Sequence, residues 1–145
     1  MFKHILMATD GSDLARKGID QGLALAKALG SKTTAVMVTE PIAAMMVGEA
    51  AIALPLDDYD AAARANAAKV LAGVSAAAAK VGVACDVLHV KDQYPAEGIV
   101  EAAKAGGCDL IVMASHGRRG ISKLLLGSQA TRVLTLNEVP VLVCR

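Results

Sequence analysis

Aromatic side chains are scarce in this sequence of 145 residues, which has one phenylalanine, two tyrosines and no tryptophan. Proteins that bind single-stranded nucleic acid without sequence preference stack the bases on several aromatic side chains. The net charge is also small, because 15 basic and 14 acidic residues leave a formal charge of +1. Nucleic-acid binding requires a strongly basic face. Both scarcities argue against a general nucleic-acid-binding protein.

Long apolar runs and paired cysteines are also missing. The hydrophobic residues make up 54% of the chain, yet none of their runs reaches the length of about 18 residues that spans a membrane. Residues 1–5 lead directly into a strand pattern and do not resemble a signal peptide, so we expect a cytoplasmic protein. Cys85, Cys108 and Cys144 are widely spaced and form no metal-binding or redox motif. We therefore predict buried, structural thiols.

Strand and helix patterns alternate along the whole chain, and each predicted helix is long enough for a crossover between parallel strands. The predicted strands are residues 2–8, 32–39, 85–90, 109–114 and 139–144. The predicted helices are residues 12–30, 59–80, 95–105 and 128–136. This order predicts a single α/β domain over residues 1–145, in which a parallel sheet is covered by helices on both faces.

Residues 109–128, with the sequence DLIVMASHGRRGISKLLLGS, are the most informative stretch. A buried strand is followed by a glycine-containing loop, and Gly127 and Ser128 then open a helical pattern. Glycine lets the backbone N–H groups of such a loop approach phosphate oxygens, and the helix would add its N-terminal N–H groups and positive dipole. The stretch indicates a phosphate or nucleotide site. For the pair at 127–128, a simple helix cap is the alternative.

Asp10 follows the first predicted strand. Ligands of doubly wound sheets bind at the carboxyl ends of the strands, where the strand order reverses. If the first and fourth strands are neighbours there, Asp10 faces the glycine loop and can accept hydrogen bonds from ribose hydroxyls. The alternative role of Asp10 is to order its own turn. Arg118, Arg119 and Lys123 lie in the same loop and are candidates for contact with the phosphates, although we favour solvated side chains for the two arginines.

Three blocks of the sequence, HILMATDGS near the start, IVMASHGRRGISKLLLGS, and VPVLVCR near the end, together resemble the universal stress protein family. The resemblance covers the full length of the chain. It implies an α/β sandwich of five parallel strands in the order 3-2-1-4-5, usually a homodimer. One branch of the family binds ATP or AMP through the signature G-x2-G-x9-G-[S/T].

By this resemblance, Gly117, Gly127 and Ser128 occupy signature positions, whereas Ala114 stands where the signature has its first glycine. The resemblance further implies that Asp10 meets the ribose or adenine side and that the main chain of Val38 meets the adenine edge. The complete set of expected nucleotide-binding residues is Ala8, Thr9, Asp10, Val38, Ala114, Gly117, Gly127, Ser128 and Gln129. Of these, Ala8 and Thr9 would line the base pocket, and the amides of Ser128 and Gln129 would face the phosphates.

The function that we expect is an adenine-nucleotide-binding stress-response or regulatory protein, not an enzyme. ATP or AMP, with Mg²⁺ brought by the phosphates, would alter conformation or partner binding. No general base or arginine finger can be assigned, and His116 has no assignable nucleophile, so any hydrolysis would be slow. The edge strand from Val139 to Cys144 would mediate a homodimer. The alternatives are a dimeric interaction module that binds no nucleotide, favoured by Ala114, and an ATP-using hydrolase or nucleotidyl transferase.

Two further features are open to interpretation. The segment 40–58 is too long for an ordinary connection, which predicts a lid or a partner-docking segment, with an ordinary loop as the alternative. His4 and His89 lie in strand patterns, where a histidine with satisfied hydrogen bonds is the better interpretation. We expect no metal site formed by the protein alone.

Overall fold

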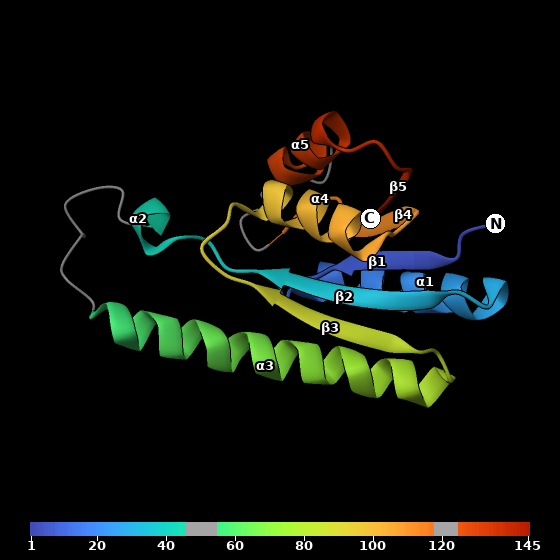
Figure 1. Ribbon diagram of the computed structural model, residues 1–145, viewed down its shortest axis with the longest axis horizontal. Helices are drawn as coiled ribbons and strands as arrows, with labels where there is room; N and C mark the ends of the chain where they lie inside the picture. Colours follow the sequence, from blue (N-terminus) through green and yellow to red (C-terminus); the bar gives the residue numbers. More distant parts are fainter. Residues whose placement is uncertain (46–54, 118–124) are drawn as a thin grey trace.

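The computed structural model describes residues 1–45, 55–117 and 125–145 of the chain. The predicted strands and helices occur in the predicted order, and one further short helix, α2, precedes α3 (Figure 1). The strands are β1 (His4–Ala8), β2 (Lys32–Val38), β3 (Cys85–Val90), β4 (Leu110–Ala114) and β5 (Val141–Cys144). The helices are α1 (Asp13–Leu29), α2 (Ile42–Met45), α3 (Leu56–Val81), α4 (Pro95–Gly106) and α5 (Ser128–Leu136).

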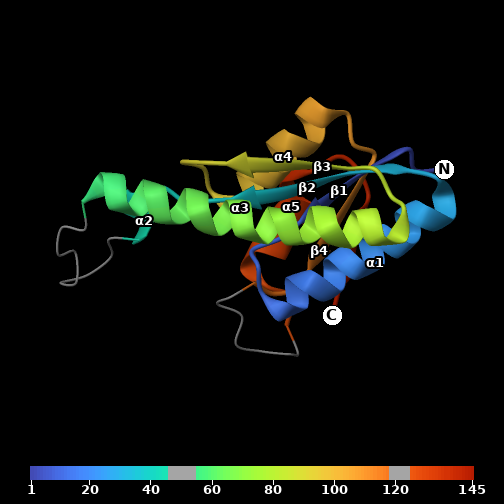
Figure 2. The ribbon, with the colours of Figure 1, turned by 90° about the horizontal axis from the view of Figure 1, so that it is seen from below.

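The five strands form one parallel sheet in the order β3-β2-β1-β4-β5, which confirms the predicted fold class and strand order. Helices α1 and α3 cover one face of the sheet, and α4 and α5 cover the other (Figures 1 and 2). Strands β1 and β4 lie side by side where the strand order reverses, and every residue of both strands is buried. Such burial on both faces fits the continuous apolar run of β4 and the apolar residues 5–8 of β1.

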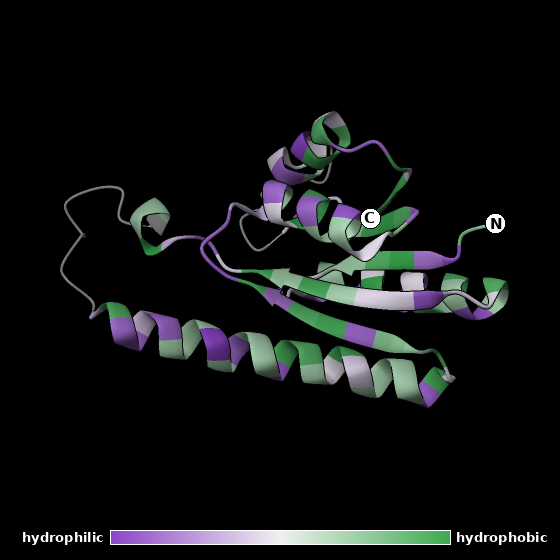
Figure 3. Ribbon diagram, in the orientation of Figure 1, coloured by the Kyte–Doolittle hydropathy of each residue, from purple (hydrophilic) through white to green (hydrophobic). Residues whose placement is uncertain are grey.

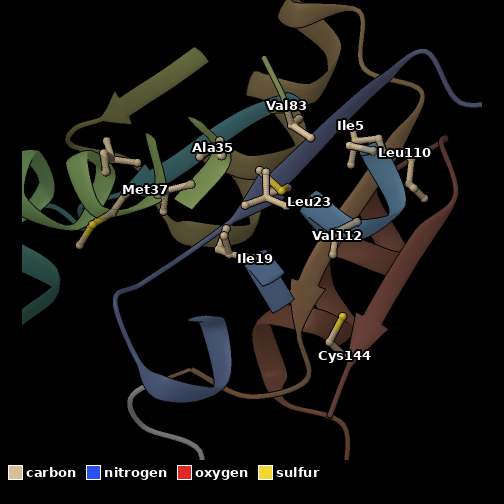
Figure 4. Close-up of a cluster of buried hydrophobic side chains, with 14 of the residues drawn as sticks. Ile5, Ile19, Leu23, Ala35, Met37, Val83, Leu110, Val112 and Cys144 are labelled. Atoms are coloured by element: carbon tan, nitrogen blue, oxygen red, sulfur yellow. The ribbon is translucent and has the colours of Figure 1, made fainter. Parts of the chain in front are cut away.

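The sheet separates two hydrophobic cores. In the first core, Ile19 and Leu23 of α1 point toward the sheet residue Val112 (Figure 4). The second core lies beneath α4 and α5 and includes Leu6 and Ile111, both fully buried. Hydrophobic residues are accordingly concentrated on the strands, while the helices alternate hydrophobic and hydrophilic residues (Figure 3). Burial on both faces therefore holds β1 and β4 rigidly in register.

Glycines end three of the helices, as the sequence predicts. Gly30, Gly82 and Gly107 follow α1, α3 and α4 with φ angles of 68°, 77° and 62°. Only glycine adopts this left-handed conformation without strain, and it allows the last carbonyls of the helix to be satisfied. At the opposite end of α1, the Ser12 side chain accepts a hydrogen bond from the amide of Ala15 at 3.2 Å. Local sequence signals thus fix where these helices begin and end.

Helix α3 is longer than predicted, because it begins at Leu56 and not at Tyr59. Pro55 precedes it and two aspartates occupy its first turn, both of which favour a helix start. Its first turns project with α2 beyond the carboxyl ends of the strands (Figures 1 and 2). Part of the predicted 40–58 loop is therefore helical. None of the described helices is both long enough and apolar enough to cross a membrane.

Four strand boundaries differ from the prediction: β2 ends at Val38 and β4 begins at Leu110, each one residue short of the predicted bound, and β1 and β5 both begin two residues late. Strand β5 begins at Val141 instead of the predicted Val139, since Pro140 has no N–H with which to join the ladder. The carbonyl of Pro140 still accepts a hydrogen bond from the amide of Ile111 at 3.0 Å. Strand β1 begins at His4, two residues later than predicted. The expected dimerisation strand is thus only four residues long.

Asp109 joins the amino ends of β1 and β4. Its carboxylate accepts hydrogen bonds from the amides of Lys3, at 2.9 and 3.1 Å, and of His4, at 3.0 Å. The hydrogen bonds from the Lys3 amide, followed by those from the His4 amide, hold the pKa of this carboxyl group below its usual range, although burial acts in the opposite direction. The ionised side chain therefore serves as a clamp between two strands that are far apart in the sequence.

The two strand histidines have hydrogen-bonding partners, as predicted. His4 is 6% exposed, and its Nδ1 lies 3.0 Å from the carbonyl oxygen of Gly106. Because a carbonyl only accepts, Nδ1 donates to it, and Nε2 lies 2.8 Å from the hydroxyl oxygen of Thr34. His89 contacts the hydroxyl of Thr39 at 2.7 Å through Nε2, and burial is the main cause that lowers its pKa. Both residues are structural.

The three cysteines are free thiols. Cys108 and Cys144 are buried, as predicted, and burial raises the pKa of both thiols. Cys85 is only half-buried, which corrects the prediction for that residue. Raised pKa values keep a thiol protonated and unreactive. Two of the three cysteines therefore serve as small core residues.

Candidate functional site

The strand order reverses between β1 and β4, which pair directly. From the carboxyl end of β1 the chain enters α1 on one face, and after β4 it enters α5 on the other face (Figures 1 and 2). This divergence is the topological switch point at which doubly wound sheets bind ligands. The predicted adjacency of the first and fourth strands is therefore confirmed. We use "switch-point site" for residues 8–10 after β1, residues 114–117 after β4, and the first turn of α5.

Asp10 and Gly117 meet across this point. A Cβ atom placed on Gly117 would lie only 2.7 Å from Oδ2 of Asp10. The other carboxylate oxygen, Oδ1, accepts a hydrogen bond from the amide of Ser12 at 2.9 Å. The turn-ordering role of Asp10 is thus present, and the same carboxylate also faces the loop after β4. The φ angle of Gly117 is not unusual, and a Cβ atom added there would require the Asp10 carboxylate to move.

Gly127 brings the start of α5 against the end of β4. Its amide donates to the carbonyl oxygen of Ser115 at 2.9 Å, and a Cβ atom at this position would lie 2.4 Å from the same oxygen. Its φ of −61° is open to any residue, so close approach alone requires glycine. The amide of Gly127 is therefore committed to the protein. The N–H groups of Ser128 and Gln129 follow in the first turn of α5. Such N–H groups have no partner within their own helix and can bind a ligand.

The first turn of α5 lacks acidic residues and has no side-chain cap. The first turns of α1, α3 and α4 each contain at least one aspartate or glutamate, which neutralises the positive end of the helix dipole. Helix α5 therefore keeps an uncompensated positive end beside the carboxyl ends of β1 and β4. An anion is the natural occupant of such a position.

The first turns of α4 and α5 are tied together by side chains. Gln129 Oε1 accepts a hydrogen bond from the amide of Ala96 at 3.2 Å. Arg132 donates to Glu97 Oε1 through Nε at 2.6 Å and also through Nη2. The hydrogen bond from Arg132 is the main cause that lowers the pKa of Glu97. Sequence analysis placed Gln129 at the phosphates but missed these ties, because their partners are 33 and 35 positions apart.

Val38 ends β2 beside the switch point. The amide of Thr9 donates to the carbonyl of Val36 at 2.9 Å, just beyond the end of β1. Alternate residues of a strand direct their main-chain groups to the same side, so those of Val38 face the side of β1, beyond that hydrogen bond. Ala8 and Thr9 are both buried. The structure thus brings the predicted base-side residues next to one another.

Ala114 occupies the position at which the expected signature has glycine. Among the described residues, Asp92 is the only non-glycine residue with a positive φ angle, at 54°. Ala114 therefore has a backbone conformation that any L-residue adopts, and the extra methyl group causes no strain there. The departure from glycine does not disturb the local fold.

Sequence analysis missed the contact between Ser115 and His116. Ser115 Oγ lies 3.0 Å from His116 Nδ1, although side chains of successive strand residues normally point to opposite faces. The contact forms because the strand has ended at Ala114. Ser115 is only 4% exposed, so its hydroxyl is not presented to solvent.

Several predicted features lie outside the described residues. These are the candidates for phosphate contact, Arg118, Arg119 and Lys123, and residues 46–54 of the long segment. Within the part of the chain that is described, no three His, Cys, Asp or Glu side chains come together in a group that could hold a metal ion.

Fold and site together define a doubly wound α/β protein in which a helix without acidic residues in its first turn begins at the switch point. Residues 1–145 match the model of the universal stress protein family. The chain belongs to this family. It is 34% identical over 145 residues to a universal stress protein of Thermus aquaticus, encoded in the QAH/OAS sulfhydrylase 3'region, and 30% identical over 149 residues to universal stress protein YxiE of Bacillus subtilis (strain 168). Each match covers 100% of both chains.

Solved structures agree with this assignment. Protein MJ0577 of Methanocaldococcus jannaschii has a TM-score of 0.83 at 26% identity, over 99% of this chain and 96% of that chain. Two more distant members share the fold. One was solved in complex with cAMP, with a TM-score of 0.72 at 22% identity over 98% of this chain and 95% of that chain. The other, from Archaeoglobus fulgidus, was solved in complex with dAMP, with a TM-score of 0.69 at 17% identity over 100% and 98%.

Proposed function

We propose that this chain binds an adenine nucleotide, ATP or AMP, at the switch-point site and acts as a regulatory protein of the stress response. The observation that carries the proposal is the double close approach at this point. Gly117 lies against Asp10, and Gly127 lies against Ser115, so that residues 115–117 lie between the acidic turn after β1 and the start of α5. Family members solved with cAMP and dAMP support an adenine nucleotide as the ligand class.

The proposed binding mode follows the chemistry of the groups. The amides of Ser128 and Gln129, at the uncompensated end of α5, hold the phosphates. The carboxylate of Asp10 accepts hydrogen bonds from ribose hydroxyls. The main chain of Val38 meets the adenine edge. The amide of Gly127 is bonded to the carbonyl of Ser115 and is not offered to the phosphates. Gly127 contributes by holding the start of α5 against the end of β4.

The other predicted residues have supporting places in the same scheme. Ala8 and Thr9 form the floor under the base, and the main chains of Ala114 and Gly117 border the phosphates. No metal-binding group of side chains is found among the described residues. A Mg²⁺ ion would therefore arrive with ATP and be held mainly by its phosphates.

Release of nucleotide from the purified, cytoplasmically expressed protein is the direct test. We expect mass spectrometry of the denatured sample to detect ATP or AMP. Calorimetric titration of the nucleotide-free protein should then give saturable binding, and titrations with Mg²⁺ and with a chelator separate a metal-dependent from a metal-independent mode. A sample that carries no nucleotide and binds neither ATP nor AMP would contradict the proposal.

An ATP-using enzyme is the second candidate, and the contact between Ser115 and His116 is the observation in its favour. A hydroxyl paired with an imidazole is a common arrangement for an activated nucleophile. The burial of Ser115 weighs against this role. Rapid steady-state turnover of ATP would support the enzyme, whereas turnover slower than nucleotide exchange would support regulation.

We further propose a homodimer in which β5 pairs with its copy. This strand lies at an edge of the sheet, and Leu142 on it is 39% exposed. An apolar edge strand is stabilised by pairing with another strand. Light scattering coupled to size-exclusion chromatography should give the mass of two chains. The mass of a single chain at high concentration would rule the dimer out.

A further inference from the structure

Helix α4 approaches the carboxyl end of β2 very closely at Gly98. A Cβ atom placed on Gly98 would lie 2.8 Å from Cγ2 and 2.9 Å from Cγ1 of Val38, and 3.3 Å from Cγ of Gln93. Contacts below 3.0 Å require one of the partners to move. Valine has a single side-chain torsion and both of its methyl groups face Gly98, so a rotation relieves only part of the overlap. The methyl groups of Val38 therefore rest directly on the backbone of α4.

The first turn of α4 cannot easily move away from β2. On its other side it is tied to α5 by the hydrogen bond from the amide of Ala96 to Gln129 and by the ion pair of Glu97 with Arg132. Three successive residues of α4 thus contact either α5 or the end of β2. Any group added at position 98 would displace Val38 more readily than the helix.

We infer that Gly98 is a positioning residue, which fixes the main chain of Val38 and thereby sets the selectivity of the site for adenine. The inference rests on the proposed function, in which the main chain of Val38 meets the adenine edge. Gly98 itself does not touch the ligand. It acts through the two methyl groups of Val38. Strand β1 pairs with β2 only as far as Val36, so the main chain of Val38 has no hydrogen bonds to β1 that hold it in place.

Base selectivity is the property that this contact controls. ATP and inosine triphosphate differ only at the base edge, where an oxygen replaces the exocyclic amino group and N1 carries a hydrogen, so that donor and acceptor positions are exchanged. A shift of the Val38 main chain disturbs the hydrogen bonds to that edge but leaves the α5 amides in place. Small displacements of positioning groups are known to have large effects on recognition. Selectivity should therefore fall more than affinity for the triphosphate does.

The test measures dissociation constants of ATP and inosine triphosphate for the wild-type chain and its variants. We expect Gly98→Ala to lower the preference for ATP roughly tenfold, and Val38→Ala, which leaves a gap against Gly98, to lower it by about threefold. In the double variant the methyl group at 98 occupies the space vacated at 38. Its preference should return to within about twofold of the wild type.

Gly73→Ala is the matched control, because a Cβ atom at Gly73 would meet nothing within 4 Å. It should keep the wild-type preference. An unchanged ratio in Gly98→Ala, or an equal loss for both nucleotides, would overturn the inference while leaving the proposed function intact. If Gly98→Ala does not fold, the inference is tested by comparing Val38→Ala with the double variant. A double variant that prefers ATP no more than Val38→Ala does would overturn the inference, because only compensation between the two positions restores selectivity. A wild-type chain that binds neither nucleotide contradicts the proposed function and the inference together.

Discussion

Gly127→Ala is expected to reduce nucleotide affinity by about 100-fold or more, because the start of α5 must move to accommodate one methyl group. The added atom would lie 2.4 Å from the carbonyl oxygen of Ser115, which is a backbone atom and cannot rotate away. Helix α5 would be pushed from β4, and the amides of Ser128 and Gln129 would leave the position proposed for the phosphates. Titration with ATP and AMP measures the effect.

Overpacking at this point is also expected to lower the free energy of unfolding by about 1–3 kcal/mol. Binding is therefore compared at a temperature where circular dichroism shows both proteins to be folded. Gly73→Ala, which adds the same methyl group to an open position, should bind as the wild type does. Unchanged affinity in Gly127→Ala would mean that the phosphate site has been placed wrongly.

Leu6→Ala is expected to have the largest effect on stability, a loss of about 3–4 kcal/mol in the free energy of unfolding. Leu6 is 0% exposed in the central strand and belongs to the core beneath α4 and α5. The substitution removes buried methyl groups and leaves a cavity that neighbours pinned on both faces of the sheet cannot fill. Urea unfolding gives the free energy, and the melting temperature should fall by about 10 °C.

Leu56→Ala makes the same chemical change at a residue that is 63% exposed. It should alter the free energy of unfolding by less than about 0.5 kcal/mol, as exposed substitutions generally do. Equal effects of the two variants would show that burial in the central strand does not determine stability in this protein.

Much of the fold could be predicted because the signals are local. Apolar runs mark the strands, and Gly30, Gly82 and Gly107 mark the ends of three helices. The errors occurred where a local signal was given too little weight. The start of α3 was missed although Pro55 and the acidic first turn indicate it, and β5 was extended across Pro140.

The candidate site was predictable only in part. The approach of the loop after β4 to Asp10 followed from the strand order that the family resemblance implied. The structural reason for glycine at positions 117 and 127 could not be predicted from the sequence. The sequence suggested room for a ligand, whereas the structure shows that Gly117 makes room for Asp10, and Gly127 for the carbonyl of Ser115.

Contacts between α4 and α5 were beyond sequence reasoning altogether. The partners of Gln129 and Arg132 depend on how the two helices pack on the sheet, and no periodicity in a single sequence encodes that packing. The same holds for Gly98 and Val38, whose contact crosses from a helix to a strand.

The pairing of β1 with β4 has a consequence for synthesis on the ribosome. Lys3 and Asp109 are clamped together although they are 106 positions apart, so β1 acquires its second neighbour only after most of the chain has been translated. At about 5–20 residues per second, the nascent chain spends several seconds with one side of its central strand unpaired. Because the switch-point site spans both strands, the nucleotide site proposed there is complete only after β4 and the first turn of α5 have been made. Under the proposed function, ligand capture would therefore be a property of nearly finished molecules.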